Sequence, residues 1–147
     1  MFEIIFKTRW SDFDPNRHMR HTAYSDYAAE VRSRYFYQHD LSLEDFARIQ
    51  IGPVIFKEET VYYKEIKMGA DIRVDMLLTA ASGKLERWEF THRIFNENDE
   101  LSAVVKVFGA WFDLQHRKLT RLPDEIIEKL KNIPVNENFK TIEIEKK

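Results

Sequence analysis

The stretch that decides the fold runs from residue 9 to residue 32 and reads RWSDFDPNRHMRHTAYSDYAAEVR. Two aspartates, Asp12 and Asp14, precede a proline. Two histidines, His18 and His21, follow within seven residues of Asp14. Apolar residues then recur at the spacing of a helix. The stretch therefore brings together carboxylates, imidazoles and a helix N-terminus, which are enough to build a reaction centre.

The helix that begins in this stretch is predicted to extend from about His21 to His39. Its apolar residues repeat with a period of about 3.6, which is typical of an amphipathic helix. These residues are Tyr24, Tyr27, Ala28, Val31 and Tyr35. Upstream, residues 2–10 alternate, which predicts a half-buried strand. One face of that strand carries Phe2, Ile4, Phe6, Thr8 and Trp10. A turn at Asp14-Pro15-Asn16 separates strand and helix, because proline restricts φ and Asp and Asn side chains bind nearby backbone.

Beyond this helix the chain is predicted to form a short helix at 42–49 and then mostly strands. Turn signals at Ser82-Gly83-Lys84 and at residues 96–99 divide the strands. The strand segments are 54–64, 72–80, 88–94 and 101–114. The last segment is apolar on both faces, so we expect it to be central and covered on both sides. A short helix at about 123–132 and a charged tail complete the chain.

This order of elements predicts an α+β fold, with an antiparallel sheet of about five strands curved around one long helix. No repeat or linker divides the 147 residues, so we expect a single domain spanning 1–147. A two-layer fold leaves the far face of the sheet and its edge strand in need of cover. Homo-oligomerisation is one way to provide that cover.

Composition excludes several classes of protein. Cysteine is absent, which rules out disulfides and cysteine-ligated zinc. The net charge of −2 argues against a nucleic-acid binder that works by bulk electrostatics. No apolar run approaches the ~18–20 residues of a membrane span, and the N-terminus lacks the pattern of a signal peptide. We therefore expect a cytoplasmic protein without membrane or nucleic-acid partners.

The chain resembles the hotdog-fold acyl-CoA thioesterases of the 4-hydroxybenzoyl-CoA thioesterase type, in element order over nearly its whole length and in one local motif. Asp12-Phe13-Asp14-Pro15 resembles the Asp-x-Asp-Pro segment of that family, in which the second aspartate is catalytic. The resemblance implies a hotdog fold, an acyl-CoA substrate, no cofactor and a catalytic role for Asp14.

Two related branches of the family match at other positions. The long-chain acyl-CoA thioesterase branch is in register at Asp14, His18, Tyr24, Glu30 and Arg32, and the branch associated with the Tol–Pal system is in register at His21. The chain departs from the first branch where Arg20 and His21 replace paired asparagines. It also has Asn16 and Arg17 where glycines are common. The resemblance therefore does not select a branch or a substrate.

The resemblance implies roles for the residues around the helix start. Asp14 would attack the thioester carbonyl or act as a general base on water, and both routes stay open. Backbone N–H groups near His21 and Thr22 would stabilise the oxyanion, because a helix N-terminus carries unpaired donors. His21 would orient Asp14 or the water, or donate to the carbonyl, and His18 would help hold the loop. Tyr24 would line the acyl pocket.

Coenzyme A carries three phosphate groups, so we expect basic side chains beside the pocket. Lys84 loosely resembles the basic patch that binds the nucleotide in 4-hydroxybenzoyl-CoA thioesterase, and Arg87 and Lys57 are further candidates. Active sites in this fold typically lie at a dimer interface. The resemblance therefore implies a homodimer or homotetramer in which these contacts and Asp14 can come from different subunits.

Each candidate also has a simpler structural interpretation. Asp14 can be an Asx turn, His21 a residue of the helix start, and His18 an anchor of the turn. His92 alternates with apolar residues and is predicted to be structural. Glu30 and Arg32 lie two residues apart and do not face each other on a helix, so we expect each to have a structural partner. A metal site built from the two aspartates and two histidines is conceivable, although spacing alone supports it weakly, and we predict no metal.

Three other functions compete with hydrolysis. The first is a hotdog protein that binds acyl thioesters without cleaving them, suggested by the replaced asparagines. The second is an aromatic sheet that stacks single-stranded nucleic acid, which the net charge and the missing RNP-type motif disfavour. The third is a hotdog dehydratase, which no feature of the sequence favours over hydrolysis.

Overall fold

The computed structural model describes residues 1–144. The helices are α1 (His21–Gln38), α2 (Leu43–Ile49) and α3 (Asp124–Lys129), with a short 3-10 turn, η1 (Trp10–Asp12). The strands are β1 (Phe2–Lys7), β2 (Ile51–Tyr62), β3 (Asp71–Ala81), β4 (Arg87–Phe95), β5 (Leu101–Asp113), β6 (Lys118–Thr120) and β7 (Val135–Thr141). The helices at 21–39 and 42–49 and the four strand segments predicted after them are confirmed, with ends within three residues of those expected.

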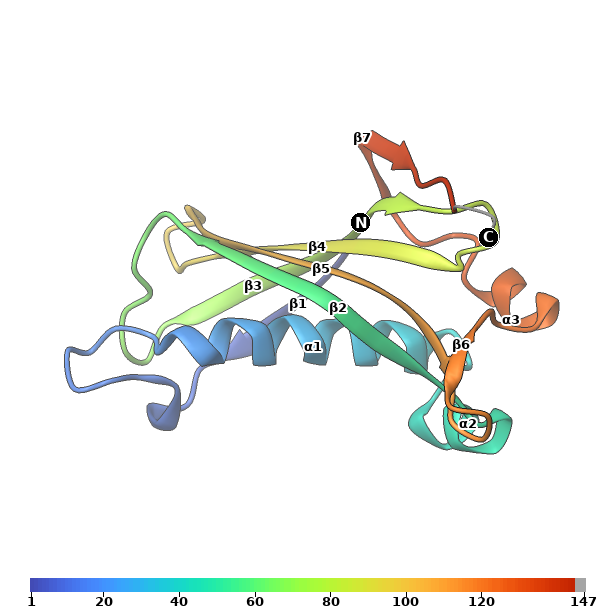
Figure 1. Cartoon of the computed structure of the whole chain (residues 1–147). Helices are drawn as coiled ribbons and strands as arrows, with labels where there is room; N and C mark the ends of the chain where they lie inside the picture. Colours follow the sequence, from blue (N-terminus) through green and yellow to red (C-terminus); the bar gives the residue numbers. More distant parts are fainter. Residues whose placement is uncertain (145–147) are drawn as a thin grey trace.

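The strands form one curved sheet, and α1 lies along one of its faces (Figure 1). The main strand order is β1-β3-β4-β5-β2, in which every neighbouring pair is antiparallel. Two short strands lie off this path, since β6 pairs with β5 and β7 runs parallel to β3. The predicted α+β hotdog arrangement, with a five-stranded antiparallel sheet around one long helix, is therefore confirmed.

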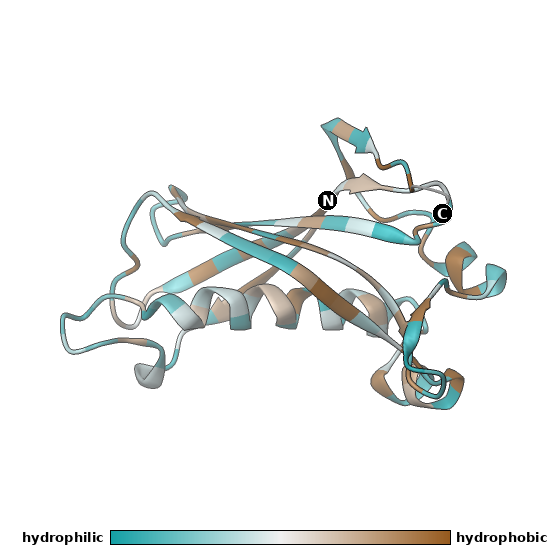
Figure 2. Ribbon diagram, in the orientation of Figure 1, coloured by the Kyte–Doolittle hydropathy of each residue, from teal (hydrophilic) through white to brown (hydrophobic). Residues whose placement is uncertain are grey.

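The face of the sheet that meets α1 holds the core. All five residues of the predicted apolar stripe of α1 are buried. They pack with aromatic side chains of the sheet, and Phe36 contacts both Phe90 and Trp111 edge-on, with ring centroids 6.2 and 6.1 Å away. Figure 2 shows hydrophobic residues along α1 and along the strands above it. Burial of this shared apolar surface is what holds the two layers together.

Three expectations about strands need correction. Strand β1 ends at Lys7, and Trp10 lies in η1 with 84% of its surface exposed, so it does not belong to the buried face. The outer face of β5 is only partly covered, because Phe108 and Phe112 are half-buried. The predicted charged tail contains β7, which pairs with the C-terminal half of β3. Residues 145–147 of that tail lie outside the described residues.

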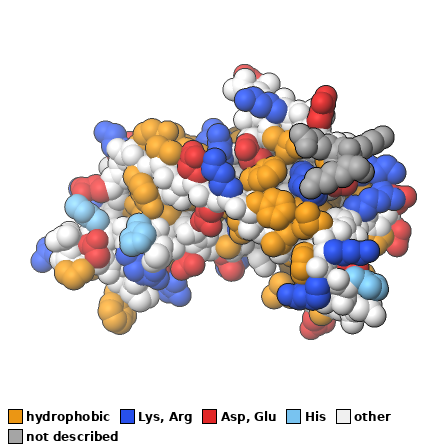
Figure 3. Space-filling view, in the orientation of Figure 1, with side chains coloured by type: hydrophobic (Ala, Val, Ile, Leu, Met, Phe, Trp, Pro, Cys, Tyr) orange, Lys and Arg blue, Asp and Glu red, His pale blue; other side chains and the backbone are white. Residues whose placement is uncertain are grey.

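Strand β2 forms one edge of the sheet and pairs only with β5 among the described residues. Its side chains from Ile55 to Glu59, and again at Val61 and Tyr62, are exposed. Figure 3 shows hydrophobic side chains gathered among basic ones on the right-hand half of the visible face. In the part of the chain that the structure describes, no helix is long and apolar enough to cross a membrane.

Candidate functional site

The loop between β1 and α1 places Asp12 inside the protein. Its side chain is fully buried and accepts hydrogen bonds from the Arg9 backbone at 2.8 Å, from the Arg9 guanidinium at 3.0 Å and from the hydroxyl of Tyr27. Burial favours the neutral acid, but the bonds from Tyr27 and Arg9 outweigh it and hold the pKa of Asp12 below its usual value. Asp12 therefore anchors the loop to α1.

Asp14 is partly exposed and shapes the turn that follows it. Its Oδ1 accepts the backbone N–H groups of Asn16 at 2.9 Å and His18 at 3.3 Å, and its own N–H donates to the His18 carbonyl at 2.9 Å. This is the Asx turn of the structural interpretation. The second carboxylate oxygen, Oδ2, accepts no hydrogen bond within residues 1–144. One oxygen thus holds the turn, and the other has no protein donor among the described residues.

The two histidines have different surroundings. The Nε2 atom of His18 lies 2.6 Å from the Glu65 carboxylate, and a β-bridge to Lys67 ties the His18 backbone to the same segment. A hollow of about 500 Å³ lies beside this contact. His21 is exposed and is the first residue of α1. The structure therefore joins Asp14 and His18 in one turn and puts His21 at the start of the helix.

The start of α1 has free donors. Arg20 occupies the N-cap position without a side-chain cap, and the first backbone bond of the helix runs from the Ala23 N–H to the Arg20 carbonyl at 3.0 Å. Among the described residues, the N–H groups of His21 and Thr22 have no acceptor. Such groups, together with the positive end of the helix dipole, suit a developing oxyanion.

Tyr24 lies one turn into α1 and is buried. Its ring meets the ring of Tyr62 on β2 edge-on, with centroids 5.0 Å apart. Burial, with a smaller contribution from Tyr62, raises the pKa of Tyr24 to about 12, so the phenol stays neutral. Tyr24 packs between helix and sheet and does not line the large cavity described below. Its role beside an acyl group stays a prediction.

The three basic candidates for coenzyme A lie away from the Asp14 turn within one chain. Lys84 is exposed in the connection between β3 and β4. Lys57 opposes Phe108 in the β2–β5 register, and Arg87 precedes the buried Trp88, so both point to the face opposite α1. There the Arg87 guanidinium lies 5.8 Å from the ring of Phe56. A site that used these residues together with Asp14 would need two subunits.

The candidate metal ligands do not converge. Within residues 1–144, no group of three or more His, Asp or Glu side chains is arranged to hold a metal ion. Asp12 is bound by Tyr27 and Arg9, and His18 is paired with Glu65.

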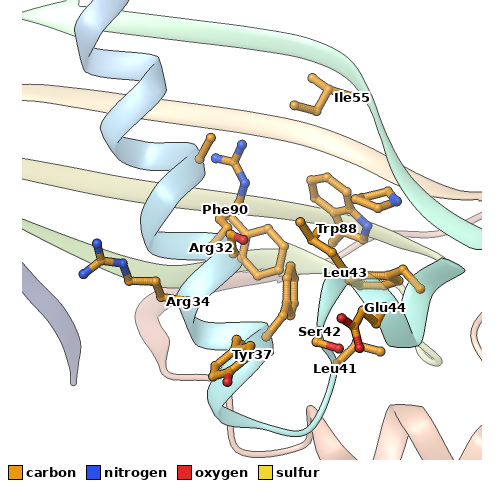
Figure 4. A pocket seen from close by; sticks show the side chains of 15 residues that line it. Arg32, Arg34, Tyr37, Leu41, Ser42, Leu43, Glu44, Ile55, Trp88 and Phe90 are labelled. Carbon is orange, nitrogen blue, oxygen red and sulfur yellow. The ribbon is translucent and has the colours of Figure 1, made fainter.

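A cavity of about 650 Å³ lies between the C-terminal half of α1, α2 and the strands β2 and β4 (Figure 4). Most of its wall is apolar or aromatic and includes Phe36, Leu41, Phe46, Ile55, Trp88 and Phe90. A cavity of this size and lining suits the apolar part of a small molecule. The sequence did not identify it, because its wall comes from four elements that only the fold brings together.

Arg32 is one of five polar residues in this wall, with Ser33, Arg34, Ser42 and Glu44. The Nη1 atom of Arg32 lies 3.1 Å from Nε2 of His92, while Nδ1 of His92 lies 2.8 Å from the Asp75 carbonyl oxygen. His92 is fully buried, and its pKa falls to about 3 because of burial and the nearby charge of Arg32. The structural role predicted for His92 agrees with this placement. Its pairing with Arg32 had no local signal, since the two residues are 60 positions apart.

Comparisons with known proteins agree with the fold. A family profile described as the thioesterase-like superfamily matches residues 8–130. A hypothetical protein of Staphylococcus aureus, solved in complex with CoA, is similar with a TM-score of 0.82 and 20% identity over 92% of this chain and 87% of that one.

Two further similar structures carry the name of an activity. One is a DHNA-CoA thioesterase of Staphylococcus aureus, with a TM-score of 0.77 and 20% identity over 88% of this chain and 89% of that one. The other is a 1,4-dihydroxy-2-naphthoyl-CoA thioesterase of Synechocystis, with a TM-score of 0.79 and 16% identity over 89% and 96%. A search of curated proteins found no match. At these identities, the likeness to solved structures shows a shared fold.

Proposed function

The chain belongs to the thioesterase-like superfamily, and we propose that it hydrolyses the thioester bond of an acyl-CoA to a free acid and coenzyme A. The observation that carries this proposal is the Asp14 turn. A partly exposed carboxylate is held by two backbone N–H groups through one oxygen, and its other oxygen is free among the described residues. Asp14 lies seven residues before His21, where α1 starts with unpaired donors.

These groups meet the main needs of thioester hydrolysis. Asp14 attacks the carbonyl carbon, or removes a proton from a water that attacks it. The N–H groups of His21 and Thr22 stabilise the oxygen as it becomes anionic. The imidazole of His21 is exposed beside them and orients the water or donates to the carbonyl. His18, paired with Glu65, supports the turn from the other side.

The proposed enzyme is a homo-oligomer that pairs through the exposed edge of β2. A two-fold axis at this edge would set the two α1 helices antiparallel. Arg32 lies eleven residues beyond His21, about 17 Å along the helix axis. The helix start of one subunit would then approach the cavity of the other. Lys57, Lys84 or Arg87 of one subunit would bind the CoA phosphates while Asp14 of the other acts on the thioester, which requires the CoA to extend to the face opposite α1, where Lys57 and Arg87 point.

The test is thiol release from a panel of acyl-CoAs, covering short, medium and long chains together with benzoyl-CoA and 4-hydroxybenzoyl-CoA. We expect turnover of at least one member. Asp14→Asn should lower kcat by about 10²–10⁴-fold, the usual range for a removed acid–base group. Asp124→Asn is the control, because Asp124 is exposed on α3 and bound only to Arg121. Full activity of Asp14→Asn would remove the aspartate from the mechanism.

The second candidate function is binding of acyl thioesters without hydrolysis. It is favoured by Oδ1 of Asp14, which holds a turn as a purely structural aspartate would. A hotdog protein that binds acyl thioesters without cleaving them would stay silent across the whole panel. It would still be stabilised against thermal unfolding by coenzyme A or by an acyl-CoA. That combination of results would show that the protein binds acyl thioesters and does not hydrolyse them.

A further inference from the structure

The guanidinium of Arg32 is fixed in the cavity wall without being neutralised. A backbone carbonyl only accepts hydrogen bonds, so the contact of 2.8 Å with Asp75 shows that Nδ1 of His92 carries the proton. Nε2 then presents a lone pair to the Arg32 Nη1–H at 3.1 Å. The imidazole is therefore a neutral acceptor, which orients the arginine but leaves its charge unpaired.

No carboxylate of residues 1–144 lies within 4 Å of the Arg32 guanidinium, whereas nine other arginines of this part of the chain form such ion pairs or stack on aromatic rings. Glu58, on the helix-facing side of β2, acts on Arg32 only from beyond that distance. A guanidinium offers five N–H donors, of which His92 uses one. The remaining donors have no protein acceptor among the described residues and are available to a ligand.

The cavity is where such an acceptor can come from. Arg32 and Arg34 are the two arginines in its lining. Figure 4 shows the side chain of Arg34 extending to the other side of α1, where it binds Glu30 at 2.8 Å. Arg32 instead rises beside Phe90 toward the sheet (Figure 4). Arg32 is partly exposed, and the lining also contains the carboxylate of Glu44, which forms no ion pair with it. An unpaired guanidinium in a mostly apolar wall favours a ligand that is apolar with one anionic end.

We propose that this cavity binds an apolar molecule that carries a carboxylate, and that Arg32 binds the carboxylate. A planar carboxylate matches the fork of the guanidinium and can accept two of its N–H groups. The carboxylate can belong to the far end of the acyl group of a dicarboxylic acyl-CoA or to a free carboxylic acid. The first source rests on the proposed function, since that acyl group would be part of the substrate. The second source does not.

Isothermal titration with decanoate and with 1-decanol tests the proposal without any turnover, because the two ligands differ only in the carboxylate. Wild type should bind decanoate about 10- to 100-fold more tightly than the alcohol, the usual gain from hydrogen bonds to a charged group. Arg32→Met should remove this preference. Methionine matches the apolar part of the side chain, and replacing a buried charge by an apolar group is often tolerated. Equal affinities in wild type, or a preference that survives in Arg32→Met, would overturn the proposal.

Two further variants test whether a change in binding in Arg32→Met comes from the lost guanidinium or from misfolding. Arg48→Met is the matched control, because Arg48 is exposed on the neighbouring α2 and binds Asp45 at 2.7 Å; it should keep the preference. Glu58→Gln leaves Arg32 intact and removes the carboxylate that competes for its charge. It should tighten decanoate binding and leave decanol unchanged, and weaker decanoate binding would contradict the role of Arg32.

The source of the carboxylate follows from turnover of decanoyl-CoA and decanedioyl-CoA. A higher kcat/KM for decanedioyl-CoA that Arg32→Met removes, with the activity toward decanoyl-CoA retained, assigns the carboxylate to the substrate. Decanoate binding through Arg32 with equal turnover of the two thioesters assigns it to a free acid. If neither thioester is cleaved, the proposed function fails for these acyl groups, while the titration still decides whether Arg32 binds carboxylates.

Discussion

Asp12 and Asp14 show how two aspartates in one short motif can have opposite uses. Asp12 is buried and fully bound by Tyr27 and Arg9, whereas Asp14 is partly exposed with one oxygen free among the described residues. The Asp12 carboxylate accepts a hydrogen bond from the hydroxyl of Tyr27, which lies fifteen residues away on α1. This bond gives Asp12 a structural role. The contact thus joins the loop to the helix on which the oxyanion site is proposed.

We predict that Tyr27→Phe lowers the free energy of unfolding by about 1–3 kcal/mol, because a buried carboxylate loses one of its donors. The pKa of Asp12 is depressed in the folded state, so its contribution is present above the unfolded pKa and is lost as the pH falls below about 4. The variant should lose less stability over that range than wild type. Urea unfolding at pH 7 and pH 3.5 measures both effects. Tyr37→Phe, at an exposed position, is the control and should match wild type.

His92 makes the stability of the protein depend on pH in a second, higher range of pH. Its pKa is about 3 in the folded protein and about 6.5 in an unfolded chain, so only the unfolded state takes up its proton between these values. Stability should therefore fall as the pH drops below 6.5, with a slope of up to about 1.4 kcal/mol per pH unit from this residue. His92→Gln keeps one donor for Asp75 and one acceptor for Arg32 but cannot titrate.

We expect the stability of His92→Gln to be less steep between pH 6.5 and pH 4 than that of wild type, as measured by chemical unfolding across the range. Other acids, including Asp12 and Asp75, are common to both proteins and cancel in the difference. Parallel curves for the two proteins would show that His92 is protonated in the folded state. That result would also remove the neutral acceptor assigned to Arg32.

At the level of single residues, the sequence predicted candidates but not their partners. Asp14 and the histidines were found because they are close in sequence, and His92 because it alternates with core residues. The burial of Asp12 by Tyr27 and the pairing of Arg32 with His92 depend on contacts 15 and 60 positions apart. Such contacts leave no local pattern, so the cavity and its arginine became visible only in the fold.

At the level of elements, β2 and β5 pack unusually closely at Gly109. A Cβ on Gly109 would collide with the carbonyl oxygen of Val54 and lie 2.7 Å from the ring of Trp88. The register of β2 shifts next to this point, between Ile55 and Lys57. The absence of a side chain at Gly109 lets the Trp88 ring lie close to β5, where it forms part of the cavity wall.

We predict that Gly109→Ala destabilises the protein by about 3 kcal/mol, because backbone and a buried ring must both move. Gly83→Ala is the matched control, since a Cβ there meets no atom within 4 Å. It should change stability by less than about 0.5 kcal/mol. Thermal unfolding of both variants measures the difference. Similar melting temperatures for the two would mean that the β2–β5 contact is looser than described.

Elements with a strong periodicity were predicted from sequence, and the short ones were not. The long helix and the strands from 51 to 113 have enough residues for a period of 3.6 or 2 to be visible. Strand β6 has three residues, and β7 reads VNENFKT, without an alternating apolar pattern. Both depend on pairing with strands already in place, because their own side chains bury little.

For the whole molecule, the fold was predictable because one helix and four long strands leave few ways to bury a shared apolar face. The fold of one chain does not cover the whole sheet. One chain leaves the edge of β2 unpaired among the described residues and exposes Ile55, Phe56, Val61 and Tyr62 beside it. An open edge of this kind is a site for pairing with another chain.

We therefore predict that the protein in solution has the mass of two or four chains of 17.7 kDa, as measured by light scattering after size exclusion. Ile55→Lys combined with Val61→Lys should shift it toward one chain, because lysines on an edge strand oppose pairing. Val135→Lys, on β7 at the other side of the sheet, replaces an exposed valine and should keep the assembly. Because Ile55 also lines the cavity, Val61→Lys alone is the variant in which activity reports on assembly. Its thiol release should fall as the measured mass falls, since the proposed site takes Asp14 and the cavity from different subunits. A monomeric wild type that still cleaves acyl-CoA would mean that one chain carries the whole site.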